Sequence, residues 1–153
     1  MADLWPDTDV TPIPGEAPAT ELRIQAKYLS DKTGGVLSCY LKTVNPNEDA
    51  ANMDDGEFIY DFFLVAPKLE YDVRLLRMRY PAAFYPLTVQ ATTSVTAELS
   101  AALNAWVLAV EGYPTKFLIQ NDVDLAVMLE AIFGATETLA LLRSVIMQSE
   151  TAP

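Results

Sequence analysis

The sequence predicts an α+β fold, in which an antiparallel meander sheet of four to five strands is covered on one face by helices. Residues 57–91 read as three consecutive strands, rich in aromatic and β-branched residues and separated by proline-containing links. Residues 20–33 and the chain after residue 94 instead carry apolar residues at helical spacing. Strands grouped with strands and helices grouped with helices are typical of α+β domains.

The 153 residues suit a single domain. Residues 1–19 contain four prolines and four acidic residues, and they predict an extended N-terminal arm because prolines at this density prevent helix formation. Residues 20–150 are expected to form the α+β domain. Residues 151–153 are expected to be a frayed C-terminus.

The first helix is predicted to begin at Thr20, which is a good capping residue, and to end at Gly34 and Gly35. Residues 36–44 alternate between apolar and polar and predict a strand. The polar segment 45–56 then leads into the meander.

The centre of the meander is predicted to be a hairpin around residues 66–70, which pairs Phe63 with Val73 and Glu57 with Arg79. Alternate residues of a strand face opposite sides of a sheet. One face is therefore the predicted core and carries Phe58, Tyr60, Phe62, Leu64, Leu76 and Met78. The other face carries Glu57, Ile59 and Asp61 against arginines of the next strand.

Arg74 does not fit this pattern, because the predicted pairing places it on the apolar face. Either the register of the two strands slips near Arg74 or this residue lies at the margin of the sheet. A slip of one residue would turn every following side chain to the other face.

Further along the chain, a helix is predicted from Ser94 or Thr96 to Val110, followed by a short strand over residues 115–120. Asn121 or Asp122 is predicted to cap the next helix, whose inward residues are Val123, Val127, Leu129 and Phe133. Thr136 is predicted to cap the last helix, with Leu139, Leu142, Val145 and Ile146 inward. Leu141 and Val145 widen its apolar stripe, which predicts a homodimer through the C-terminal helices.

The composition excludes several kinds of chemistry. The chain has no histidine and one cysteine, so it has no Ser-His or Cys-His catalytic pair, no internal disulfide and no thiolate metal cluster. Residues 32–34 carry the letters of a phosphate loop in the wrong order, and residues 45–56 do not match a calcium loop. We therefore predict no catalytic, cofactor-binding or metal-binding residues and no enzyme activity, and we interpret Cys39 as an inert core thiol.

The net charge of −11 and the pI near 4.2 indicate repulsion from nucleic acids and from anionic membranes. Such an acidic surface either attracts basic protein partners or serves only to keep the protein soluble. The N-terminus lacks the pattern of a secretory signal. The longest mostly apolar run is about ten residues, whereas a membrane-spanning helix needs roughly 20. We therefore expect a cytoplasmic location.

A block of acidic residues is the first candidate binding site. It consists of Glu48, Asp49, Asp54, Asp55, Glu57 and Asp61, and no basic residue interrupts the chain between Lys42 and Lys68. Such a block is either a solvated loop and strand edge or a docking surface that selects a cationic partner.

Three arginines, Arg74, Arg77 and Arg79, form the second candidate site. Arginines on a strand either pair with acidic residues across the sheet, here Glu57 and Asp61, or bind an anion, because the guanidinium fork matches carboxylate and phosphate. Tyr71, Tyr80 and Tyr85 lie near them in the sequence and suit the second interpretation.

Together these observations predict a small, acidic, non-catalytic protein-binding module. The first interpretation is an immunity-type inhibitor that covers the basic site of a toxin or nuclease. The alternative is a cytoplasmic chaperone or adaptor that escorts a partner protein by means of an apolar groove beside its sheet. A third is an anion-binding or enzymatic site on the arginine-rich face. The size, acidity and architecture fit the general profile of bacterial toxin-immunity proteins and of small secretion chaperones, and no motif favours either.

Overall fold

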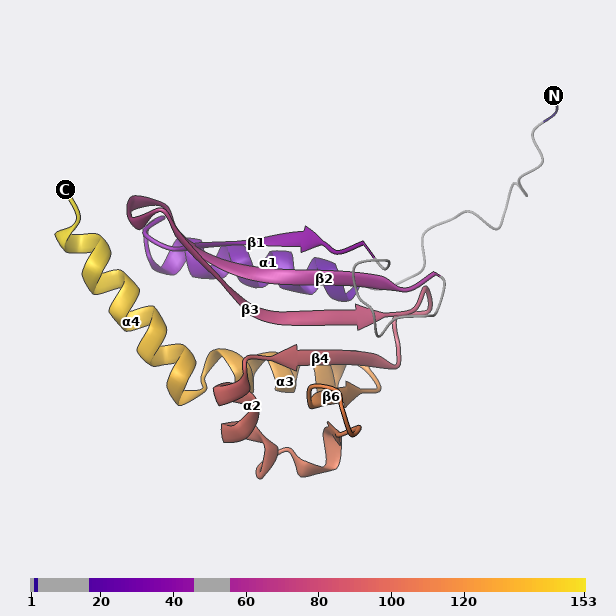
Figure 1. Ribbon diagram of the computed structural model, residues 1–153. Helices are drawn as coiled ribbons and strands as arrows, with labels where there is room; N and C mark the ends of the chain where they lie inside the picture. The colour runs from indigo at the N-terminus through magenta and orange to yellow at the C-terminus, as the bar shows by residue number, and fades with distance from the viewer. Residues whose placement is uncertain (1, 3–16, 46–55) are drawn as a thin grey trace.

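The computed structural model describes residue 2 and residues 17–45 and 56–153. These residues form an α+β fold with one six-stranded antiparallel sheet in the order β1-β2-β3-β4-β6-β5 (Figure 1). The strands are β1 Ser38–Thr43, β2 Phe58–Ala66, β3 Tyr71–Tyr80, β4 Leu87–Ala91, β5 Val107–Leu108 and β6 Lys116–Ile119. The fold class is confirmed, and the sheet has six strands rather than the four to five predicted.

Four α-helices accompany the sheet in the described part of the chain: α1 Pro18–Lys32, α2 Thr93–Ser100, α3 Asp122–Phe133 and α4 Thr136–Thr151. Two short 3-10 helices, η2 Pro67–Leu69 and η3 Asn104–Trp106, lie in connections. Helix α1 packs mainly against β1, whereas α4 packs against α2, α3, β2 and η2. Figure 1 shows α1 and α3 on the same side of the sheet, with α4 crossing one end of the fold.

The core lies between the sheet and these helices. The side chains of β2 and β3 that face the helices alternate as predicted, and Phe62 and Leu76 are almost completely buried. The other fully buried large residues of this core are Leu22, Leu37, Leu64, Met78, Leu87, Phe117, Ile119, Met128 and Ile132. Phe58 was predicted to belong to this core, but its side chain is 46% exposed, because it is the first residue of β2 and lies at the end of the sheet.

An irregularity between β2 and β3 sets the register of the sheet. Phe62 pairs with Leu76 and Phe63 pairs with Arg74, so Leu75 has no partner in β2. One extra residue in one strand is a β-bulge, and it changes which face the following side chains occupy. Of the two alternatives considered for Arg74, the structure shows the register slip, and Arg74 lies on the face opposite the helices.

The predicted hairpin pairs are wrong in detail. Arg79 pairs with Ile59 rather than with Glu57, and Val73 pairs with Leu64 rather than with Phe63. The predicted pairing of Arg79 is shifted by two residues, and a shift of two residues leaves every side chain on the same face of the sheet. The buried face and the ion-paired face were therefore assigned correctly up to the bulge.

The helix predicted to reach Val110 ends at Ser100. Val107 and Leu108 instead form β5 and pair with Phe117 and Lys116 of β6. The backbone groups of these two residues are satisfied by pairing with β6 instead of by helical hydrogen bonds, so the helical spacing of their side chains did not predict their structure.

The helix starts also differ from the predictions. Helix α1 begins at Pro18, within the predicted arm, because proline fits the first turn of a helix. Thr136 is the first residue of α4 rather than its cap, and its amide donates to Oε2 of Glu98 in α2 at 2.8 Å. Asn121 caps α3 as predicted, because its Oδ1 accepts from the amide of Asp124 at 2.8 Å. The last helix extends to Thr151, one residue into the segment predicted to fray.

The buried face of α3 was predicted wrongly in part. Leu125, Met128, Leu129 and Ile132 are buried, whereas Val123 and Val127 are exposed. Apart from Glu130, every residue of α3 after its first turn is apolar, so the spacing alone could not select the buried face.

Residues 3–16 of the predicted arm lie outside the described residues. Within residues 17–45 and 56–153, no single helix has the length and apolar composition needed to cross a membrane; α3 and α4 meet that criterion only as a pair, with a 55° bend between them.

The packing predicts a large difference between two phenylalanines of β2. Phe62→Ala is expected to lower the free energy of unfolding by about 3–5 kcal/mol, as truncation of a buried aromatic does. Phe58→Ala is the control on the same strand and is expected to cost about 1 kcal/mol or less, since this side chain is half exposed. Urea unfolding measures both, and a cost below about 1 kcal/mol for Phe62→Ala would contradict the assigned core.

Candidate functional site

The predicted acidic block is divided by the structure. Glu48, Asp49, Asp54 and Asp55 lie outside the described residues. Glu57 and Asp61 lie on the sheet face opposite the helices, where they meet the arginines of β3. These two acidic residues therefore contribute to interactions within the sheet.

Asp61 is the centre of this ion-paired face. Its side chain is almost fully buried, with the whole residue only 5% exposed. Arg77 donates from Nε to Oδ1 at 2.7 Å and from Nη2 to Oδ2 at 3.0 Å, while Nη1 of Arg74 lies 3.7 Å from Oδ1. A two-pronged guanidinium–carboxylate pair is the strong form of this interaction and offsets the cost of burying the carboxylate.

The second ion pair of this face joins Nε of Arg79 to Oε2 of Glu57 at 3.3 Å. All three predicted arginines are therefore within ion-pair distance of a carboxylate, which is the cross-strand pairing considered from the sequence. An anion that binds there would have to displace these carboxylates.

Of the three tyrosines expected beside the arginines, Tyr80 and Tyr85 pack in or against the core, and Tyr71 pairs with Ala66 at the start of β3. Tyr80 is buried on the helix side, where its ring contacts Tyr60, Phe58 and Phe84. Tyr40 was not predicted for this site, yet its ring stacks on Phe63 at 5.1 Å and its hydroxyl donates to Asp72 at 3.4 Å. The pairing of Tyr40 with Phe63 depends on the β1–β2 register, which no local pattern in the sequence specifies.

An apolar groove of about 310 Å³ lies on the other side of the sheet, between α1 and α4. Its floor is formed by strand residues Cys39, Phe62 and Leu75. One wall is formed by Gln25, Tyr28, Leu29 and Lys32 of α1. The other is formed by Phe133, the last residue of α3, and by Thr138, Leu139 and Leu142 of α4. The bulge contributes directly, because it adds Leu75 to a face that Leu76 already occupies.

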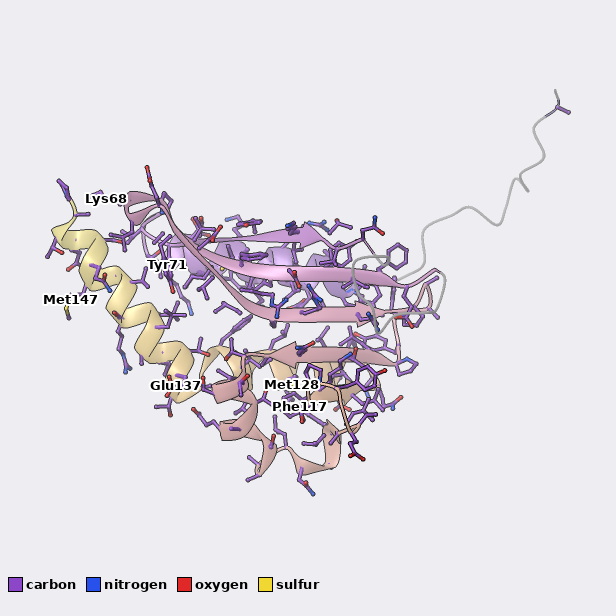
Figure 2. The ribbon with its side chains drawn as sticks, viewed as in Figure 1. Lys68, Tyr71, Phe117, Met128, Glu137 and Met147 are labelled. Carbon is purple, nitrogen blue, oxygen red and sulfur yellow. The ribbon has the colours of Figure 1, made fainter. Side chains whose placement is uncertain are left out.

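The groove exists because its two walls belong to helices with different main packing partners. The buried residues of α4 are Thr138, Val145 and Ser149, so Leu139 and Leu142 remain half-buried along the groove. Figure 2 shows Met147 on the outer side of α4, directed away from the sheet. Helix α4 thus has apolar side chains on more than one side, as its wide predicted stripe indicated.

Cys39 is the residue of the groove floor that carries a thiol. Burial raises the pKa of its thiol to about 12. The thiolate is the nucleophilic form of cysteine, so at neutral pH this side chain is a protonated, inert thiol, in agreement with the sequence-based interpretation.

Among the described residues, no group of three or more histidine, cysteine, aspartate or glutamate side chains is arranged to hold a metal ion. The groove offers shape and apolar surface rather than reactive groups. Several of its residues were predicted as core residues from the sequence, but none was assigned to a binding site, although an apolar groove beside the sheet was part of the adaptor hypothesis. The wide apolar stripe of the last helix was the available signal, but it was interpreted as a homodimer surface.

Comparisons with protein-family models, with curated proteins and with solved structures found no match to this chain. The function proposed below rests on the geometry and chemistry of the described residues, because a fold class by itself does not specify a function.

The burial of Asp61 predicts a stability effect. Asp61→Asn keeps the shape of the side chain but removes the charge that faces Arg77 and Arg74, so we expect a loss of about 2–3 kcal/mol of unfolding free energy. Asp72→Asn changes an exposed acid on the same strand pair and is expected to cost no more than about 0.5 kcal/mol. Equal midpoints for both variants in urea unfolding would show that the Asp61 pair adds little to the stability of the sheet.

The raised pKa of Cys39 predicts slow and pH-dependent thiol labelling. At pH 8 we expect an aromatic disulfide reagent to label the native protein at least about 100-fold more slowly than the urea-unfolded chain, whose thiol has an ordinary pKa of about 8.5. Between pH 9 and 11 the native rate should still rise about tenfold per pH unit, because the thiolate fraction is still increasing. A native rate that levels off near pH 9 would contradict the burial of this thiol.

Proposed function

We propose that this protein is a small non-catalytic adaptor or chaperone, which holds an apolar segment of a partner protein in the groove between α1 and α4. The observation that carries the proposal is the groove itself, with an apolar floor contributed by three strands and mostly apolar walls contributed by α1, α4 and the last residue of α3. Amphipathic segments commonly bind such grooves by inserting a few apolar side chains.

The size and lining of the groove support this role. A volume of about 310 Å³ is at the lower end of the range of roughly 300–1,000 Å³ for binding pockets and accommodates a few side chains. Tyr28, on the α1 wall, is 53% exposed although it is aromatic. Large aromatic residues at the edge of an apolar groove are typical anchors of protein interfaces.

The chemistry of the groove favours binding over catalysis. The described residues that line it include no carboxylate, and the thiol of Cys39 is protonated at neutral pH. General acid–base catalysis needs a group whose pKa lies near the working pH and within reach of the reacting atom.

The immunity-type inhibitor is the second proposal, and the net charge of −11 supports it. An acidic surface increases the association rate with a basic partner and disfavours nucleic acids and anionic membranes. We also propose a cytoplasmic location. We further propose a weak homodimer through α4, which the exposed side chain of Met147 supports. An anion site on the arginine face has less support, because Arg74, Arg77 and Arg79 lie beside carboxylates.

Two sets of variants distinguish the adaptor from the inhibitor. Tyr28→Glu introduces a charge into the groove, and Tyr113→Glu is the matched control, because Tyr113 is 56% exposed and does not line the groove. The third variant changes Glu48, Asp49, Asp54 and Asp55 to their amides. Each is used to capture partners from a lysate of the organism that encodes the protein, with quantification by mass spectrometry.

For an adaptor, we expect Tyr28→Glu to reduce capture of the partner at least about tenfold, which corresponds to a binding loss of about 1.4 kcal/mol. Tyr113→Glu and the amide variant should retain the partner, with slower association for the amide variant only. Loss with the amide variant and retention with Tyr28→Glu would favour the inhibitor and contradict the adaptor.

A further inference from the structure

A second hollow of about 450 Å³ lies next to the groove, between α1 and α3. Gln25 and Phe133 line both hollows, so the two adjoin along α1. The second hollow is lined by Glu21, Gln25, Ala126, Leu129, Glu130, Phe133 and Gly134.

The charges that line the two adjoining hollows are separated along α1. Glu21 and Glu130 lie at one end, and no basic residue is among the described residues that line this end. Lys32 lies at the other end, in the wall of the first hollow. Glu21 and Lys32 are 11 positions apart in α1, which corresponds to about 16 Å along a helix axis.

Exposed apolar residues of α3 lie near Glu130 at the acidic end. Glu130 is the only charged residue of α3 after its first turn. Val123 and Val127 precede it by seven and three positions, so they lie near Glu130 on the same exposed side of α3, and both are exposed. Exposed apolar residues beside a groove extend the area that a partner can cover.

The carboxylate of Glu21 is held by Gln25, whose Nε2 donates to its Oε1 at 3.0 Å. This contact fixes the carboxylate at the edge of the groove without neutralising its charge. A partner that covers two carboxylates without supplying a cation would leave both desolvated, which is unfavourable.

We infer that the partner segment is amphipathic and carries a lysine or arginine that binds between Glu21 and Glu130, with its apolar side chains in the α1–α4 groove. This inference rests on the proposed function and adds the chemistry of the partner. A helical segment of about 11 residues is as long as the distance from Glu21 to Lys32 along α1. In such a segment the basic residue lies at one end, and the apolar residues follow one to three helical turns later. Complementary charge at one end also sets the direction in which the segment binds.

The experiment uses a phage-displayed library of helical 16-residue peptides, in which the apolar positions of one face are fixed and the positions before them are randomised. Three forms of the full chain are used for selection: the unmodified protein, the double variant Glu21→Gln/Glu130→Gln, and the double variant Glu137→Gln/Glu150→Gln. The last is the matched control, because it removes the same charge from exposed acidic residues of α4 outside both hollows. Figure 2 shows Glu137 at the start of α4.

We expect lysine and arginine to be enriched before the first apolar position with the unmodified protein and with the control, and the enrichment to disappear with Glu21→Gln/Glu130→Gln. A selected lysine peptide should bind this variant about tenfold more weakly at low salt, as loss of a partly buried charge pair predicts, whereas its glutamine counterpart should bind all three forms equally.

Two other outcomes are distinguishable. Peptides that lose binding on Tyr28→Glu but show no preference for basic residues, or an equal loss on the control variant, would overturn this inference and leave the proposed function intact. If no selected peptide depends on Tyr28, the groove is not a docking site, and both the proposed function and this inference are overturned.

Discussion

The β-bulge at Leu75 is the constraint on which much of the structure depends. It allows Leu75 and Leu76, which are adjacent in sequence, to be buried together on the helix side of the sheet. It also turns Arg74 to the opposite face, within reach of Asp61. One extra residue in β3 thus contributes to the core, to the ion-paired face and to the floor of the groove, because the alternation of a strand changes face at a bulge.

The two faces of the sheet use their residues in different ways. On one face, two of the candidate acids, Glu57 and Asp61, form ion pairs with the three candidate arginines, and Asp61 accepts from Arg77 and lies within ion-pair distance of Arg74. A buried carboxylate with a two-pronged arginine partner specifies the pairing of β2 with β3, since a shift in register would leave a buried charge without its partner. These five charged residues interact with one another, so they are less available to a partner than the sequence indicated.

The other face combines stability with an open surface. Phe62 is part of the core and also of the groove floor, so the same side chain supports the fold and shapes the proposed docking site. Helices α3 and α4 contain more apolar residues than one packing contact buries, and the excess lies along the groove and on the outer side of these helices. An apolar surface of this kind is typical of proteins that bind partners.

The sequence by itself determined the fold class, the order of the first four strands, and the alternation that places Phe62, Leu76 and Met78 in the core. These properties follow from local patterns, namely aromatic and β-branched runs, proline-containing links and helical spacing. Such patterns need no knowledge of distant residues.

Only the tertiary structure decided the remaining properties. The exposed side of α3, the short strand β5 and the exact strand pairs all depend on which distant element packs alongside, and the apolar composition of α3 left its buried side open. The groove depends on the same choice, because a space between α1 and α4 is a property of how two helices pack on the sheet rather than of either helix. The sequence contained the apolar residues, and the packing of the elements decided which of them a partner can reach.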